Sequence, residues 1–431
     1  MKKAAICALL AAAVFTGCSA SGSVENLLSP PIMFDLQEEI YYALEKSVGK
    51  EIELVYPRSG TYRSPIILED IDRDGADEAV VLYRKKDEIR MNILDTDENG
   101  SWMSAADAEG GGTGVDRVLI SSLGDAQRIS VIVGFNSAGS DSSMKIFTYG
   151  QNGLEETAAA YGYGSMFLYD LNNDGNNELY ILNSNNEYIG RKASLTSVSD
   201  TGTKIAESAS VSLNSGSSEF INISLGNVGE NTPAIYIDEL CSGQLYTEII
   251  YDVGGTLRNP LYLDERESIL NTVRSRGYLS TDIDLDGIIE IPTLSYFPGY
   301  SQDNRDSFFV TNWNVYQNFT ITKKYASYYD LDRNFCFIIP SRWDGLVTVK
   351  HDEHNGDIVF YRYFSDILNS TEELMRISAV TKEYNEEKLT EGYVLLKTRD
   401  NLSFFYKLPE DSESSLVLTT TEIVNNFYLM I

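Results

Sequence analysis

Apolar residues at every fourth position predict one amphipathic helix over residues 34–48. Asp35 can cap the start of this helix, and Gly49 can end it. The apolar face of the helix carries Leu36, Ile40, Leu44 and Val48. No similar period of three to four residues dominates the chain that follows, so this helix stands apart from the rest of the fold.

After the helix the hydrophobic period changes to two, in short runs such as residues 79–83, 129–133 and 179–182. Turn residues separate these runs, among them Asn99-Gly100 and Gly254-Gly255. Many short strands at regular spacing predict a body built of β-sheets. One further helix is predicted over residues 264–276, which begin with a capping box and are followed by Gly277.

A nine-residue pattern occurs three times without gaps, at residues 70–78, 170–178 and 282–290. These copies read DIDRDGADE, DLNNDGNNE and DIDLDGIIE, and residues 120–125 and 223–227 are weaker echoes. With the echoes included, the unit recurs about every 50 residues, which suits a four-stranded propeller blade of about 40–50 residues. The repeats therefore predict a mainly β fold, a β-propeller of about five to seven blades.

Each copy places an acid or amide at positions 1, 3, 5 and 9 and a glycine at position 6. Alternate side chains of a tight loop converge on one centre, and their hard oxygens suit Ca²⁺. The predicted ligands are Asp70, Asp72, Asp74 and Glu78; Asp170, Asn172, Asp174 and Glu178; and Asp282, Asp284, Asp286 and Glu290. The second loop should bind most weakly, because Asn172 replaces an acid.

The same residues have two alternative interpretations, an EF-hand and a polar turn that binds no metal. An EF-hand needs an acid at position 12, where this chain has Val81, Ile181 and Thr293, so that motif does not fit. A polar turn that binds nothing would explain a single copy, but three copies in one register, two of them clearly followed by a strand, favour a structural calcium role. Residues 95–100 resemble the pattern superficially and are interpreted as a hairpin turn.

The first residues, MKKAAICALLAAAVFTGC, predict export. Lys2 and Lys3 precede an apolar stretch over residues 4–15, which is too short to span about 30 Å of hydrocarbon. Residues 1–17 are therefore interpreted as a signal peptide, and residues 18–33 as a tether with a lipid on Cys18. The protein would then be anchored to the bacterial cell membrane and face outward. Ordinary cleavage with full secretion is the alternative.

The three loops resemble the FG-GAP or VCBS-type repeats of bacterial surface propellers, which are related in architecture to the integrin α-subunit head. The resemblance covers roughly residues 60–300 and implies a calcium-braced propeller. Residues 14–17, before Cys18, resemble the lipobox of bacterial lipoproteins. With this segment, the first helix and residues 339–345, the chain resembles a group of bacterial surface lipoproteins. That resemblance implies no particular reaction.

Beyond residue 325 the repeat is lost, so residues 34–325 are assigned to the first helix and the propeller. Residues 326–431 are predicted to form a separate small α+β domain. Its expected elements include a hairpin over 349–363, strands at 335–340, 374–380, 392–397 and 404–408, and a final helix over 421–431.

The chain has 431 residues, with 34 Lys and Arg against 64 Asp and Glu, and a formal net charge of −30. Such an acidic chain has no cationic surplus for phosphates, which excludes nucleic acid as a partner class.

The cysteines predict no disulfide. Cys241 and Cys336 remain after export; they lie far apart in the sequence, which favours two buried free thiols over a disulfide. The sequence contains no cluster of cysteines and histidines, so a structural zinc site is not expected.

The sequence contains no motif that predicts a particular catalytic reaction. The only histidines, His351 and His354, lie beside Asn355-Gly356 and predict a solvated hairpin tip, so a Ser-His-Asp triad is not expected. Several aromatic residues could in principle form a ligand-binding surface, but packing in the core and between strands is the simpler interpretation. They are Tyr161, Tyr163, Tyr296, Tyr300, Trp313 and Trp343.

The leading prediction is a non-enzymatic, calcium-binding cell-surface lipoprotein that presents its propeller to an unidentified extracellular protein or glycan. The alternative is a surface carbohydrate-active hydrolase, which would need only two carboxylates, although nothing in the sequence selects a pair. A third possibility is an assembly accessory for envelope proteins.

Overall fold

The structure is a computed structural model that describes residues 35–430. It leaves out residues 124–127, 137–141, 151, 184–193, 201–204, 214–218, 263–270, 304–306 and 411–413, and the side chains of residues 157–161. The predicted signal peptide, tether and lipidated Cys18 lie outside the described residues, as does most of the helix predicted over residues 264–276. The described end of that segment, residues 271–276, is not helical and contains the strand Arg274–Ser275, so the helix prediction is wrong there.

The described helices are few and short. They are α3 (Asp35–Val48), α5 (Asn385–Thr390) and α6 (Thr420–Asn426), with 3₁₀ turns η1 (Ser341–Trp343) and η2 (Lys382–Tyr384). None of the helices in the described part of the chain has the length and apolar character needed to cross a membrane. The helix expected at residues 34–48 is confirmed as α3, with Ile40 and Leu44 buried.

Strands dominate the rest of the chain and form six sheets in which every strand pair is antiparallel. The first sheet has β1 (Ile52–Leu54), β2 (Ile66–Glu69), β3 (Glu78–Lys85), β4 (Glu88–Thr96) and β5 (Trp102–Glu109). The second has β6 (Gly114–Ser122), β7 (Ile129–Asn136), β8 (Ser142–Gly150) and β9 (Gly153–Tyr163). The third has β10 (Ser165–Tyr169), β11 (Glu178–Asn183), β12 (Ser194–Asp200) and β13 (Ile205–Ser212).

The remaining three sheets continue the series. The fourth has β14 (Glu219–Val228), β15 (Thr232–Cys241), β16 (Gln244–Asp252), β17 (Leu257–Arg258) and β18 (Arg274–Ser275). The fifth has β19 (Ile291–Tyr296), β20 (Phe309–Gln317), β21 (Thr320–Asp330), β22 (Phe335–Ile338) and β28 (Phe427–Leu429). The sixth has β23 (Val347–His351), β24 (Ile358–Arg362), β25 (Glu373–Thr381), β26 (Val394–Arg399) and β27 (Leu402–Lys407).

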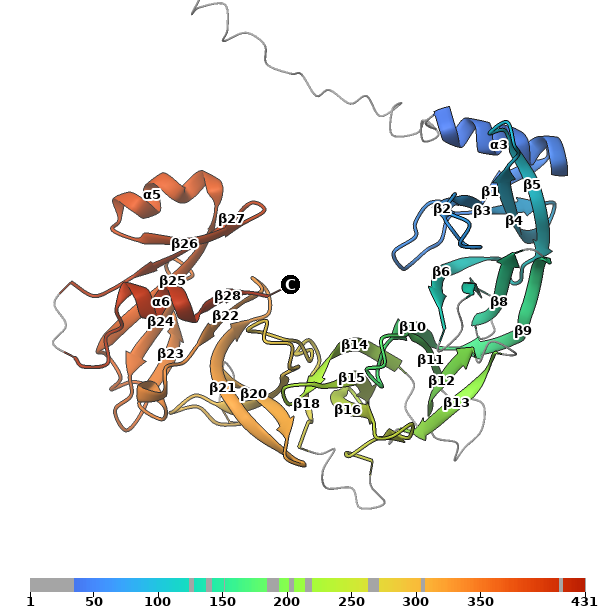
Figure 1. Ribbon diagram of the computed structural model, residues 1–431. Helices are drawn as coiled ribbons and strands as arrows, with labels where there is room; N and C mark the ends of the chain where they lie inside the picture. Colours follow the sequence, from blue (N-terminus) through green and yellow to red (C-terminus); the bar gives the residue numbers. More distant parts are fainter. Residues whose placement is uncertain are drawn as a thin grey trace, which may run out of the picture.

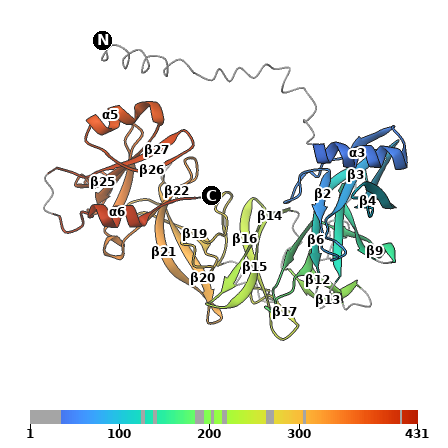
Figure 2. The same ribbon diagram turned by 45° about the horizontal axis from the view of Figure 1, so that its top comes forward.

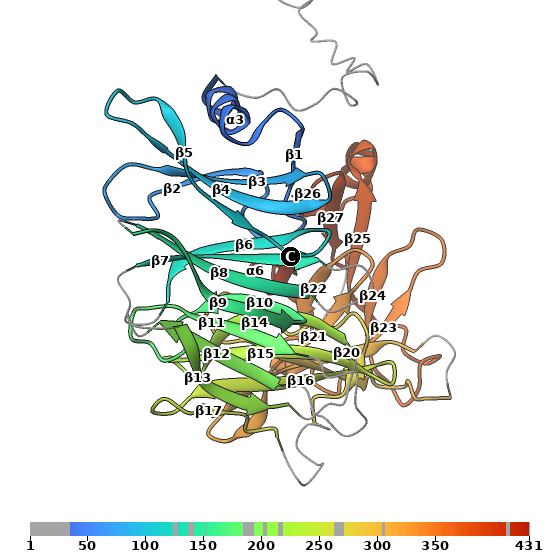
Figure 3. The ribbon, with the colours of Figure 1, turned by 90° about the vertical axis from the view of Figure 1, so that its right-hand side faces the viewer.

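The sheets follow one another around an open arc, with α3 and the first sheet at one end and the sixth sheet at the other (Figures 1 and 2). Seen from the side, the first four sheets lie over one another as layers (Figure 3). The prediction of a mainly β fold is confirmed. Within the described residues no sheet closes on itself, and α3 covers the face of the first sheet that points away from the second.

The central strands of the first and fourth sheets are apolar on both faces because each face packs against a neighbouring element. In β3, Val80 and Leu82 enter the core shared with the second sheet, whereas Val81 packs beneath α3. In β15, Ile235 packs against the third sheet and Tyr236 against the fifth. Burial on both faces explains why these strands are continuous apolar runs in the sequence.

The fifth and sixth sheets share one core. Tyr328 and Phe337 of the fifth sheet pack in the same cluster as Phe360 of the sixth and Trp343 of η1. The boundary predicted between residues 325 and 326 falls inside β21, and β28 returns from the end of the chain to pair with β22.

Most elements expected after residue 326 are present. The hairpin predicted over residues 349–363 is confirmed as β23 and β24. The final helix is shorter than predicted and ends at Asn426, after which the chain becomes a strand.

The predictions for the tryptophans, histidines, cysteines and tyrosines can be compared with the exposure and contacts of their side chains. Trp313 and Trp343 are core residues, and His351 and His354 lie exposed at a hairpin, as expected. Both remaining cysteines are free, as expected, but Cys241 is only half-buried. Tyr163 is buried, and Tyr296 packs against Phe309. The side chain of Tyr161 lies outside the described part.

Candidate metal centres

The three repeat copies fold into the same backbone loop. Loop 1 is Asp70–Glu78, loop 2 is Asp170–Glu178 and loop 3 is Asp282–Glu290. Position 4 is left-handed in each, with φ of 65° at Arg73, 59° at Asn173 and 62° at Leu285, and so is the glycine at position 6. Such angles favour glycine and explain why position 6 has no side chain.

Hydrogen bonds from the backbone hold each loop in this shape. The first aspartate accepts from the glycine N–H at position 6: Asp70 at 3.2 Å, Asp170 at 2.8 Å and Asp282 at 2.8 Å. The residue at position 2 is apolar and buried, and anchors the loop in the core beneath: Ile71, Leu171 and Ile283. In loops 1 and 3 the acids at positions 1, 3 and 9 converge.

Loop 1 brings three carboxylates together without a basic partner among its contacts. One oxygen from each of Asp70, Asp72 and Glu78 lies within 4.8 Å of the others. Glu78 is fully buried; its Oε2 accepts from the Ile71 N–H at 2.9 Å, but its Oε1 has no hydrogen-bond partner. Oδ1 of Asp70 is likewise without a partner. A buried polar atom without a partner is costly, so this pair of oxygens marks a place for a cation.

The pKa shifts of the loop 1 carboxyl groups agree with this close arrangement of acids. Burial, followed by the charges of Asp72 and Asp95, raises the pKa of Glu78 to about 7. Burial, followed by neighbouring aspartates, also raises the pKa of Asp72. Ionised carboxylates in this position repel one another, and a divalent cation would relieve that repulsion. Asp74 stays outside the cluster: it is exposed and accepts from the Ala76 N–H at 2.8 Å.

Asp95 is a member of this acidic environment that the sequence analysis missed. The sequence predicts a hairpin turn over residues 95–100; the β4–β5 hairpin is confirmed, but Asp95 itself lies in β4 and pairs with Met103. However, Ala79 of β3 pairs with Leu94 of β4, so the next residues, Glu78 and Asp95, lie side by side. Only strand pairing, not motif spacing, places Asp95 near loop 1.

Loop 2 differs because its third position is an amide. The Asn172 Nδ2 donates to Asp174 Oδ2 at 2.9 Å and to Glu178 Oε1 at 3.3 Å. These contacts place a neutral N–H₂ group between the carboxylates. Burial, followed by the charges of Asp174 and Asp170, raises the pKa of Glu178 to about 7, and Glu178 Oε2 has no hydrogen-bond partner.

Loop 3 brings Asp282, Asp284 and Glu290 within 4.8 Å of one another, as predicted, but it also receives a basic side chain. The Lys324 Nζ lies 2.9 Å from Asp284 Oδ2, 2.6 Å from Asp286 Oδ2 and 2.8 Å from Glu290 Oε1. Burial alone would raise the pKa of Asp284, but hydrogen bonds from Lys324 and Tyr325 hold it below its usual value. The sequence analysis missed both of these residues.

The loops also connect neighbouring sheets. Ile288 of loop 3 forms a parallel bridge with Asn227, whose N–H donates to the Gly287 carbonyl at 2.8 Å. Asn177 of loop 2 forms a parallel bridge with Leu123 at the end of the second sheet. Both bridges involve the regions recognised as weak echoes, so each of these two loops rests on the echo region of the sheet before it.

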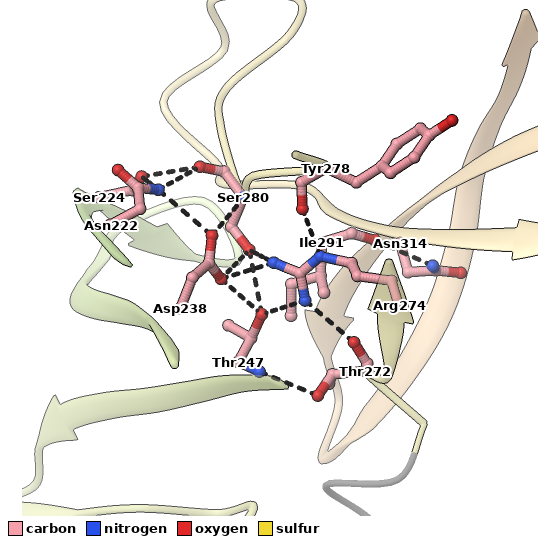
Figure 4. A network of polar contacts seen from close by, with 10 residues as sticks. All are labelled: Asn222, Ser224, Asp238, Thr247, Thr272, Arg274, Tyr278, Ser280, Ile291 and Asn314. Carbon is pink, nitrogen blue, oxygen red and sulfur yellow. Dashed lines mark hydrogen bonds and ion pairs between the residues drawn. The ribbon is translucent and has the colours of Figure 1, made fainter. Parts of the chain in front are cut away.

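A buried polar network fixes the segment that leads into loop 3 (Figure 4). Arg274 Nη2 lies 2.6 Å from Asp238 Oδ1, and both side chains are fully buried. Asp238 Oδ2 accepts from the Ser280 N–H at 2.7 Å, and Thr247 Oγ1 donates to Asp238 Oδ1 at 2.7 Å. The network thus attaches residues 272–280 to β15 and β16 immediately before loop 3 begins.

Comparisons with known proteins add little to this picture. No protein-family model matches the sequence, and a search of curated proteins finds no match. The chain is similar to the crystal structure of a protein from Lactobacillus plantarum, at 11% identity and a TM-score of 0.31, over 73% of this chain and 84% of that one. It is also similar to the exotype rhamnogalacturonan lyase YesX, at 10% identity and a TM-score of 0.29, over 76% and 74%. Scores this low carry no argument about function.

Proposed function

We propose that this protein is a calcium-binding, non-enzymatic surface lipoprotein in which calcium braces a series of β-sheets. Loop 1 is the principal calcium site, with Asp70, Asp72 and Glu78 as its acidic ligands. The observation that carries the proposal is the fully buried Glu78, whose Oε1 has no partner and belongs to a cluster of three carboxylates. Hard oxygens converging in a tight loop are the ligand set that Ca²⁺ prefers.

The calcium would act on the architecture rather than on a substrate. Loop 1 joins β2 to β3, and its Arg73 Nη2 donates to Ser122 Oγ of the second sheet at 2.5 Å. An ion that fixes this loop would therefore stiffen the contact between the first two sheets. In this proposal the arc of meandering sheets is an opened β-propeller whose loops meet an extracellular protein or glycan. Export and the lipid on Cys18 rest on the sequence alone.

Calcium is expected to stabilise the protein measurably. Free calcium at 100 times its dissociation constant adds about 2.7 kcal/mol per site, since it binds only the folded chain. Thermal melting of the purified protein in calcium and in chelator should show a midpoint several degrees higher in calcium. Asp72→Asn should abolish most of this shift.

Asp97→Asn is the matched control for that experiment. Asp97 lies in the similar DTDENG segment, but its Oδ1 accepts from the N–H groups of Asn99 and Ser101 in an exposed turn. This variant should keep the full calcium shift. An equal loss in both variants, or no shift in the unmodified protein, would contradict a calcium site in loop 1.

Loop 2 supports a second, weaker site in this proposal. Asn172→Asp is expected to tighten calcium binding there by about an order of magnitude, because affinity follows the number of charged ligands. The substitution also removes the N–H₂ group between Asp174 and Glu178. Isothermal titration of the two chains would measure the difference. Unchanged titration curves would mean that calcium does not enter loop 2.

A further inference from the structure

The ammonium of Lys324 has the contacts that a bound cation would have in loop 3. Its Nζ lies within 2.9 Å of one oxygen each from Asp284, Asp286 and Glu290. A lysine ammonium has three N–H donors, and here there are three carboxylates to receive them. The side chain is mostly buried, with 20% of its surface exposed, so the pairs are only partly screened by solvent.

A β-bulge delivers this lysine to the loop. Trp313 of β20 pairs with Tyr325, but the next residue, Asn314, pairs with Lys323, so Lys324 is the extra residue between them. Successive side chains of a regular strand point to opposite faces, and a bulge re-aims one of them. As a result Lys324 and Tyr325 both reach loop 3, where the Tyr325 hydroxyl donates to Asp284 Oδ2 at 2.7 Å.

The contrast with loop 1 is clearest at position 9. In loop 3 both oxygens of Glu290 have partners, Oε1 with Lys324 and Oε2 with the Ile283 N–H at 2.9 Å. In loop 1 the equivalent Glu78 accepts from the Ile71 N–H through Oε2 at 2.9 Å, but its Oε1 has no hydrogen-bond partner. Of the loop 3 acids, Asp284 keeps one oxygen, Oδ1, without a partner. A metal ion entering loop 3 would have to displace an ammonium bound to three carboxylates.

We propose that Lys324 is the resident cation of loop 3, so that this loop is closed by the chain itself and takes no calcium. If loop 1 binds calcium as proposed, the same backbone motif is filled in two ways, by a metal in loop 1 and by a side chain in loop 3. This inference goes beyond the proposed function, because it holds whether or not loop 1 binds calcium.

The test is the number of calcium ions bound per chain, measured by equilibrium dialysis of the full protein with calcium alone. Lys324→Met should bind about one additional calcium, because it leaves a carboxylate set of the kind that Ca²⁺ takes. Lys323→Met is the matched control: Lys323 is the exposed neighbour on the same strand, and its removal should add no site. Asp284→Asn in the unmodified chain should leave the number unchanged.

Either of two results would overturn the inference. One is a Lys324→Met chain that is folded in calcium, as judged by circular dichroism, and binds no more than the unmodified protein. The other is loss of one bound calcium in Asp284→Asn, which would show that the metal enters loop 3 beside Lys324. If Lys324→Met unfolds in chelator and refolds in calcium, the inference is supported, since the metal then replaces the ammonium. The proposed function fails separately, if the unmodified protein binds no calcium at all.

Discussion

Asp238→Ala is expected to lower the free energy of unfolding by about 3–5 kcal/mol, because it leaves the buried Arg274 guanidinium without its counter-ion. Both side chains are fully buried, and their closest atoms are 2.6 Å apart. The arginine cannot escape the problem by losing its proton at neutral pH. Its remaining hydrogen bonds, to the carbonyls of Thr272 and Tyr278 and to the hydroxyls of Thr247 and Ser280, are all to neutral groups and do not replace the lost charge.

The loss should extend to loop 3. Asp238 accepts from both the N–H and the hydroxyl of Ser280, each at 2.7 Å, and Ser280 is two residues before Asp282. Without the carboxylate, the segment that enters loop 3 loses two of its hydrogen bonds to the fourth sheet (Figure 4). Hydrogen exchange of amides in residues 278–290 should therefore accelerate more than exchange in the first sheet.

Urea unfolding measures the energetic part of this prediction. Glu53→Ala is the comparison, because Glu53 forms an exposed ion pair with Arg84 at 3.6 Å, and such pairs contribute about 0–1 kcal/mol. The double variant Asp238→Leu with Arg274→Met should be far less destabilised than the sum of the single losses, since apolar replacement of a whole buried pair is often tolerated. A loss near that of Glu53→Ala would show that solvent reaches the pair.

Local sequence patterns predicted the parts of the fold that depend on neighbours in the chain. The spacing of Ile40 and Leu44 predicted α3, and Asn99-Gly100 predicted the β4–β5 hairpin. The position of glycine in the repeats predicted a sharp bend, which the left-handed Gly75, Gly175 and Gly287 confirm. Each of these features is determined by backbone preferences within about ten residues.

Features that depend on distant pairing could not be predicted in this way. β28 pairs with β22 across roughly 90 residues, which joins the end of the chain to the fifth sheet, and no periodicity reports such a contact. The same limit hid Asp95 and Lys324 from the site prediction. Asp95 reaches loop 1 through strand register, and Lys324 reaches loop 3 through a bulge. Counting acids in a motif therefore identified the candidate loops but not their electrostatic partners.

Trp343→Ala is expected to cost about 3–5 kcal/mol, the usual loss when a buried tryptophan is truncated. The indole is almost fully buried, and its Nε1–H donates to the Leu416 carbonyl at 2.6 Å. Its ring lies 6.2 Å from that of Phe337 in the fifth sheet and 5.5 Å from that of Phe360 in the sixth. The cavity would therefore open at the junction of two sheets, and both should lose protection together.

Hydrogen exchange with peptide resolution would follow the two sheets separately in the Trp343→Ala protein. Leu368→Ala is the control, because Leu368 is 88% exposed and its truncation should change stability by less than about 0.5 kcal/mol. Joint loss of protection in β21, β22 and β24 is the expected result, since Tyr328, Phe337 and Phe360 belong to one core. If the fifth sheet kept its protection while the sixth lost it, the sixth sheet would behave as a unit of its own, without the part of residues 326–431 that belongs to the fifth sheet. The shared core argues against that outcome, because removing one sheet exposes the apolar face of the other.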